Sequence, residues 1–113
     1  MAIKQLKFLS RARRDLKDFP DDARKEAGVQ LYRLQQGLQP EDWKPMQAAG
    51  RGVEEVRISE ASGAFRVLYI ARFRQAVYVL HCFQKKTQST SSADIDVAAR
   101  RYRELMRMLQ DGN

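Results

Sequence analysis

The chain has 113 residues, a length typical of one domain with one modest hydrophobic core, so we expect residues 1–113 to form a single domain. Lysine and arginine together number 21 against 14 aspartates and glutamates, which gives a formal charge of +7. No apolar stretch approaches the ~20 residues that span a bilayer, and charges interrupt the first residues before a signal-peptide core develops. We therefore expect a soluble, cytoplasmic protein. Its charge favours a polyanionic partner, although an evenly solvated basic surface would explain the charge equally well.

The chain contains a single cysteine, Cys82, and a single histidine, His81. No internal disulfide can form, which fits a reducing compartment. One cysteine and one histidine cannot make a usual zinc site, and no glycine-rich phosphate loop is present. We therefore expect neither a metal nor a small-molecule cofactor, and we expect Cys82 to be a buried structural thiol.

The first half of the chain predicts one strand followed by two helices. Residues 3–9 mix apolar and basic side chains in a short run that favours a strand. Apolar residues then recur at helical spacing until Pro20, and a second helical stripe runs from residue 21 to about residue 38. We expect these two segments to form a helical hairpin. Residues 41–52 lack periodicity and predict a loop that ends in a flexible basic link containing Arg51.

The second half predicts three strands and a final helix. Residues 53–58, 65–72 and 76–83 are rich in β-branched and aromatic side chains, and the turns between them are too short for a helix, so antiparallel pairing is expected. A last apolar face of helical period follows Ser92. The order β–α–α–β–β–β–α predicts an α+β fold in which the helices cover one side of a small twisted antiparallel sheet. The other face would meet solvent or a ligand.

The strand register predicts which charged residues lie close together. With a turn at residues 60–63, Arg57 lies directly opposite Arg66, and opposed residues project from the same face. With a turn at residues 73–74, Arg66 lies opposite His81. A single extra residue in either turn would reverse the faces of a strand.

Period-two alternation then separates a charged face from an apolar one. Arg57, Arg66 and His81 share the first face, and Lys85 and Lys86 extend it at the end of the third strand. The residues expected on the apolar face are Phe65, Val67, Tyr69, Tyr78, Leu80 and Cys82.

This cationic face suits a phosphodiester. Arginine offers a planar fork that matches phosphate oxygens, and lysine offers a mobile point charge. RNA cleavage by its own 2′-hydroxyl needs charge stabilisation at phosphorus and a group that moves a proton, for which His81 has a suitable unperturbed pKa. The alternatives are a structural histidine and solvated strand arginines. Because Arg66 is expected to be exposed, Arg66→Ala should abolish activity without disturbing the fold.

Three sequence runs carry a resemblance to a known family. They are Gly-Val-Glu-Glu-Val-Arg-Ile at 52–58, Phe-Arg-Val-Leu-Tyr at 65–69 and Val-Leu-His-Cys-Phe-Gln-Lys-Lys-Thr at 79–87. The chain resembles the RelE/ParE superfamily of type II toxins, and more closely its phage-derived HigB-like branch. The resemblance implies a RelE-like fold over residues 1 to about 105.

The resemblance also implies a function. It implies a toxin that cuts mRNA on the ribosome without metal, inhibits translation and is held in check by a cognate antitoxin, often of the helix-turn-helix type. The catalytic candidates are Arg66, Lys85, Lys86 and His81, and the candidates for RNA binding are Arg57, Arg51 and Thr87.

Two departures keep other functions open. Ribonuclease members often have Lys-x-Lys where this chain has Glu55 and Arg57, and many carry a catalytic Tyr or His near the C-terminus, where this chain predicts a long helix. The superfamily also includes members that act on DNA gyrase. The alternatives are therefore a non-catalytic gyrase-targeting or phage regulatory binding protein, and a relic that only binds its partner.

Overall fold

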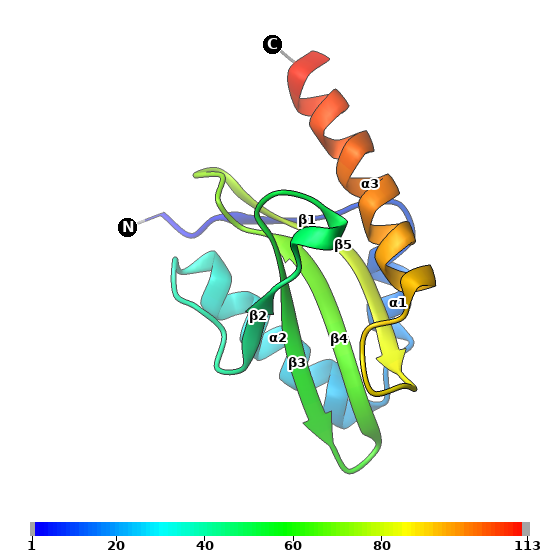
Figure 1. Ribbon diagram of the computed structural model, residues 1–113. Coiled ribbons are helices and arrows are strands. Elements are labelled where there is room, and N and C mark those ends of the chain that lie inside the picture. Colours follow the sequence, from blue (N-terminus) through cyan, green and yellow to red (C-terminus); the bar gives the residue numbers. More distant parts are fainter. Residues whose placement is uncertain (1, 112–113) are drawn as a thin grey trace.

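A five-stranded sheet with helices on both faces forms the centre of the computed structural model, which describes residues 2–111 (Figure 1). The strands lie in the order β1-β5-β4-β3-β2. The elements in chain order are β1 (Gln5–Phe8), α1 (Ala12–Lys17), α2 (Asp21–Gln35), β2 (Trp43–Pro45), the short 3-10 helix η1 (Gln47–Ala49), β3 (Val53–Glu60), β4 (Gly63–Ile70), β5 (Ala76–Lys85) and α3 (Ser92–Asp111).

The predicted antiparallel pairing of the three long strands is confirmed, since β3 pairs with β4 and β4 with β5. The sheet as a whole is mixed, however, because β1 pairs in parallel with β5. The segment predicted as a loop contains β2, which pairs antiparallel with β3. Three residues are too few to show a period-two pattern, which explains why the sequence did not reveal this strand.

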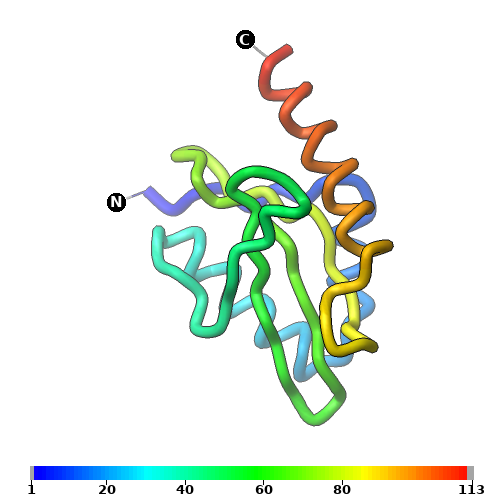
Figure 2. The backbone as a smooth tube through the Cα atoms, viewed as in Figure 1, coloured from blue at the N-terminus to red at the C-terminus, as the bar shows by residue number. Residues whose placement is uncertain are grey.

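The helices cover both faces of the sheet, so the prediction that they share one side is wrong. Figure 2 shows the path of the chain, with α1 and α2 behind the sheet and α3 in front. Helices α1 and α2 bury Ala12, Ala27 and Leu31 against Val67 and other residues of the rear face. On the front face α3 buries Ala98 and Leu105 in a second cluster. The apolar stripe of α3 needs its own sheet surface, because the rear face is already covered.

Helices α1 and α2 do not form a clear hairpin. Helix α1 has only six residues and packs on the rear face against β5, whereas α2 has fifteen residues and packs on the same face against β3. Residues 18–20 join them. Both helices are held mainly by the sheet rather than by each other.

A bulge in β5 changes which side chains reach the front face. Leu68 lies opposite His81 and Tyr69 lies opposite Val79, so Leu80 is an extra residue in β5. An extra residue reverses the alternation beyond it. Tyr78 and Leu80 therefore join the cluster beneath α3, and their predicted place beside Cys82 is wrong.

Candidate functional site

Four cationic side chains converge on the front face of the sheet, on neighbouring strands. Lys44 of β2, Arg57 of β3, Arg66 of β4 and Lys85 of β5 share this face. The ladder explains the arrangement, because Arg57 lies opposite Arg66 as predicted, Lys44 opposite Glu55 and Lys85 opposite Ala64. We call these four residues the cationic cluster. Figure 1 shows helix α3 on the β5 side of the sheet.

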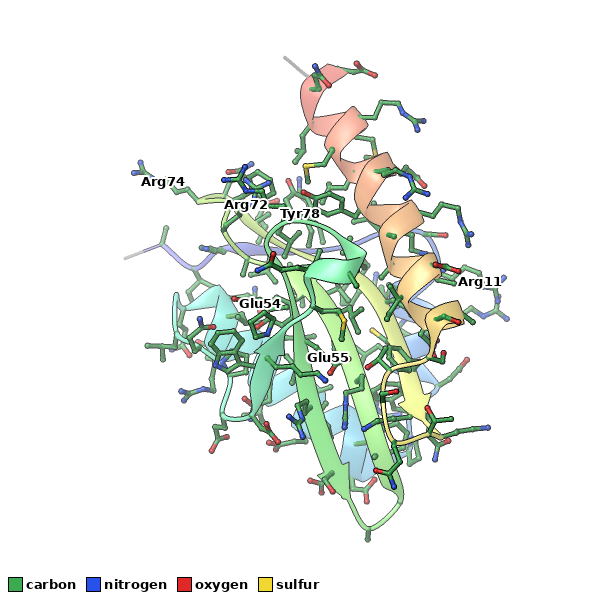
Figure 3. All side chains as sticks on the ribbon, in the orientation of Figure 1. Arg11, Glu54, Glu55, Arg72, Arg74 and Tyr78 are labelled. Carbon is green, nitrogen blue, oxygen red and sulfur yellow. The ribbon has the colours of Figure 1, made fainter. Side chains whose placement is uncertain are left out.

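A buried acid, Glu55, which is labelled in Figure 3, lies beside two members of the cluster. Its side chain is 0% exposed, and its Oε1 lies 3.6 Å from Arg66 Nε and 3.7 Å from Lys44 Nζ. Its Oε2 accepts a 2.6 Å hydrogen bond from the Thr90 hydroxyl. Oε1 itself has no hydrogen-bond partner. A buried carboxylate needs cations beside it, so Glu55 fixes where the two positive groups lie.

Arg66 is buried rather than exposed, which corrects the sequence-based expectation. Only 6% of the residue is accessible, and its guanidinium donates a 2.8 Å hydrogen bond to the Phe65 carbonyl. Burial lowers the pKa of Arg66, and the carboxylate of Glu55 opposes that shift. Arg66→Ala would remove a cation from a buried carboxylate and destabilise the fold. Loss of activity in the Arg66→Ala variant would therefore not show whether Arg66 acts in function or in stability.

Arg57 and Lys85 are the more accessible members of the cluster. The Arg57 side chain is 42% exposed, and its Nε lies 3.7 Å from Asp42 Oδ1. Lys85 is partly exposed, and desolvation followed by the positive charges of Arg66 and Lys44 lowers its pKa. The carboxylates of Glu55 and Asp42 offset two of the four positive charges, so a net positive charge remains on this face. The cluster can therefore bind an anion that reaches it from solvent.

His81 of β5 lies on the same face, but its side chain contacts the first turn of α3. The residue is 8% exposed, its Nε2 lies 2.7 Å from Asp94 Oδ1, and its ring stacks on Phe83 with a centroid distance of 4.8 Å. Burial lowers its pKa. The predicted pairing with Arg66 is wrong, since Arg66 lies opposite Phe83 and His81 lies opposite Leu68.

The remaining predicted site residues lie on exposed loops. Lys86 and Thr87 follow Lys85 directly, and the Thr87 hydroxyl donates to the Ser89 carbonyl. Arg51 lies in the turn before β3, at the end of that strand farthest from the β3–β4 turn. Arg57 is the fifth residue of β3, so it lies roughly 13 Å along the strand from Val53, and Arg51 precedes Val53. Arg51 is therefore not part of the cluster.

Sequence reasoning missed Lys44, Glu55 and Thr90 as members of the site. Glu55 is two residues from Arg57 in the same strand, so period-two alternation could have placed both on one face. Lys44 lies in a segment without periodicity. Thr90 approaches Glu55 only because the loop after β5 folds back over the sheet, which no local pattern shows.

The described part of the chain contains neither a candidate metal site nor a helix that could span a membrane. Among residues 2–111, no three His, Cys, Asp or Glu side chains are close enough together to hold a metal ion. No helix in the same range has the length and apolar character needed to cross a membrane. Cys82 is 2% exposed, and burial raises the pKa of its thiol, as expected of a structural cysteine.

The fold and the site define a small α+β protein with a cationic cluster on one face of its sheet. The sequence matches the family described as "Phage derived protein Gp49-like (DUF891)" over residues 14–103, a range that includes every member of the cationic cluster. The chain belongs to this phage-derived Gp49-like family. No curated protein matches it.

Proposed function

We propose that this protein is the toxin of a type II toxin–antitoxin pair, of the HigB-like branch of the RelE/ParE superfamily, and that it cleaves mRNA on the ribosome without metal. The observation that carries the proposal is the cationic cluster, in which Arg57 and Lys85 reach solvent beside the oriented guanidinium of Arg66. Membership of a phage-derived family and the three toxin-like sequence runs support it.

The cluster suggests how its groups divide the chemistry. The RNA phosphate lies against Arg57, Arg66 and Lys85, whose charges stabilise the additional negative charge at pentavalent phosphorus. The 2′-hydroxyl loses its proton to solvent, its oxygen attacks phosphorus and the bond to the 5′-oxygen breaks. Lys85, whose pKa is lowered, gives a proton to the leaving oxygen. Lys86 and Thr87 bind the adjoining backbone, and His81 positions Asp94 and Phe83 rather than moving the proton.

The same surface suggests how the toxin is controlled. A cognate antitoxin, expected to carry a helix-turn-helix, would cover the cluster with an acidic segment. An association steered by charge weakens as salt increases.

Induction of the protein in bacterial cells, with 5′-end mapping of transcripts, tests the proposed function. We expect growth to stop and new 5′ ends to appear within coding regions. Arg57→Gln should abolish both effects, because it removes an exposed charge and leaves the Glu55 contacts in place. Arg74→Gln is the matched control, since Arg74 is exposed in the turn before β5.

Two outcomes would contradict the proposal. DNA-damage signalling with intact mRNA would support the gyrase-targeting alternative. If cells producing the Arg57→Gln protein show the same 5′ ends as wild type at equal protein levels, the cluster is not the active site.

A further inference from the structure

A small pocket lies beside the cationic cluster and shares Lys85 with it. It is formed by the end of β5, the loop of residues 86–91 and the first turn of α3. Phe83 is its aromatic wall, and Lys85, Ser89, Ser91 and Asp94 line much of the rest. Its volume is about 230 Å³. Pockets for drug-sized ligands usually measure about 300–1,000 Å³, so this one suits a single planar ring system.

The pocket is placed to receive a group attached to the phosphate at the cluster. Phe83 lies directly opposite Arg66 in the β4–β5 ladder, and Lys85 is two residues farther along the same face. Opposed residues have Cβ atoms about 5 Å apart. A nucleoside joined to a phosphate at Arg66 and Lys85 is therefore within reach of the Phe83 ring.

Neighbouring contacts hold Phe83 in position. The residue is partly exposed, and the ring of His81 stacks against it at an interplanar angle of 25°. His81 is in turn fixed by Asp94 through the 2.7 Å contact of its Nε2. An aromatic ring held in this way is a suitable platform for a nucleobase, because every base has a π face.

The polar wall of the pocket favours hydrogen-bond donors. Asp94 Oδ2 accepts a 2.7 Å hydrogen bond from the Ser91 hydroxyl, and Asp94 Oδ1 forms a hydrogen bond with His81 Nε2. Each carboxylate oxygen has two lone pairs, so each can accept one more donor. Carboxylates recognise the amino group of cytosine in this way.

From this geometry we propose that the pocket binds one nucleobase of the RNA, and that it prefers a base with an exocyclic amino group (adenine, cytosine or guanine) over uracil. The base stacks on Phe83 and donates its amino group to Asp94. This inference rests on the proposed function, because the RNA phosphate at the cluster delivers the base to the pocket.

Binding of mononucleotides to the purified protein, followed by NMR, tests the pocket without requiring cleavage. We expect CMP to bind more tightly than UMP and to shift the signals of Phe83 and Asp94. Phe83→Leu should weaken CMP binding about tenfold, through loss of stacking. Phe73→Leu is the matched control, because Phe73 is also partly exposed but lies in the turn before β5, beneath Arg72.

A second variant tests the preference itself. Asp94→Asn keeps the size of the side chain and replaces one acceptor with a donor, so the preference for CMP over UMP should decrease or reverse. Thermal melts of each variant establish that it is folded. If Asp94→Asn does not fold, the Phe83→Leu comparison still decides.

The outcomes separate the pocket from the proposed function. Equal binding of CMP and UMP, or unchanged CMP binding by Phe83→Leu, overturns the nucleobase pocket even where mRNA cleavage is mapped in cells. Selective CMP binding that Phe83→Leu weakens about tenfold, in a protein that cuts no mRNA, supports the pocket and overturns the ribonuclease function.

Discussion

One buried carboxylate, Glu55, contacts two of the four cations of the site. It is fully buried, contacts Arg66 and Lys44, and is hydrogen-bonded by Thr90. Its Oε1 nevertheless has no hydrogen-bond partner. Unsatisfied buried polar atoms are rare, and departures from the usual rules of stability concentrate at functional sites. An unsatisfied buried oxygen costs stability, and Arg66 and Lys44 lie beside this one.

His81 should make stability depend on pH. Burial lowers its pKa in the folded protein below the ordinary value of 6.5, so the unfolded chain binds a proton more readily. The stabilisation it contributes is complete above pH 6.5 and is lost as pH falls toward the lowered folded pKa. We expect the free energy of unfolding, measured by urea denaturation, to decrease between pH 7 and pH 5.5.

His81→Gln isolates that contribution. The glutamine amide can still donate to Asp94 but does not titrate, so the decrease between pH 7 and pH 5.5 should be smaller than in wild type. An equal or larger decrease in the variant would show that other groups cause the acid sensitivity.

At the scale of elements, the sequence predicted where the three long strands lie in the chain better than it predicted their pairing register. Turn residues placed β3 against β4 so that Arg57 lies opposite Arg66, as found. The β4–β5 register was wrong by two residues at His81, because the turn between these strands is longer than assumed and β5 contains a bulge at Leu80. The bulge places Tyr78 and Leu80 in the cluster beneath α3, and local sequence pattern does not show it.

The contact between α3 and η1 depends on a glycine. Gly50 has φ = 152°, and a Cβ there would lie 2.6 Å from carbons of the Tyr102 ring. Gly50→Ala should therefore lower the free energy of unfolding by roughly 2–4 kcal/mol, through backbone strain and overpacking. Chemical denaturation of the purified variant measures this change.

Gly28→Ala is the matched control for Gly50→Ala. Gly28 lies within α2 with nothing within 4 Å of an added Cβ, so this variant should gain about 1 kcal/mol from better helix propensity. Tyr102→Ala should relieve the clash, so the double variant with Gly50→Ala should lose less stability than the two single changes together. Equal effects at Gly50 and Gly28 would contradict this account of the α3 contact.

For the whole molecule, composition and pattern predicted the α+β class but not the layering. Periodicity located all three helices, yet it could not show which sheet face each one covers. The parallel pairing of β1 with β5 joins segments about 70 residues apart, and no local signal reports such a contact. The site was found in part because Arg57 and Arg66 follow from strand alternation, whereas Lys44 and Thr90 depend on the tertiary fold.

The salt dependence of binding to a short single-stranded RNA tests most directly whether the cationic cluster holds RNA phosphate. The logarithm of the association constant falls linearly with the logarithm of salt concentration, with a slope of about −0.7 per phosphate contact. Arg57→Gln and Lys85→Gln should each make that slope shallower by about 0.7, and Arg74→Gln should leave it unchanged. Slopes that are the same for all three variants and wild type would show that RNA phosphate does not bind at the cluster.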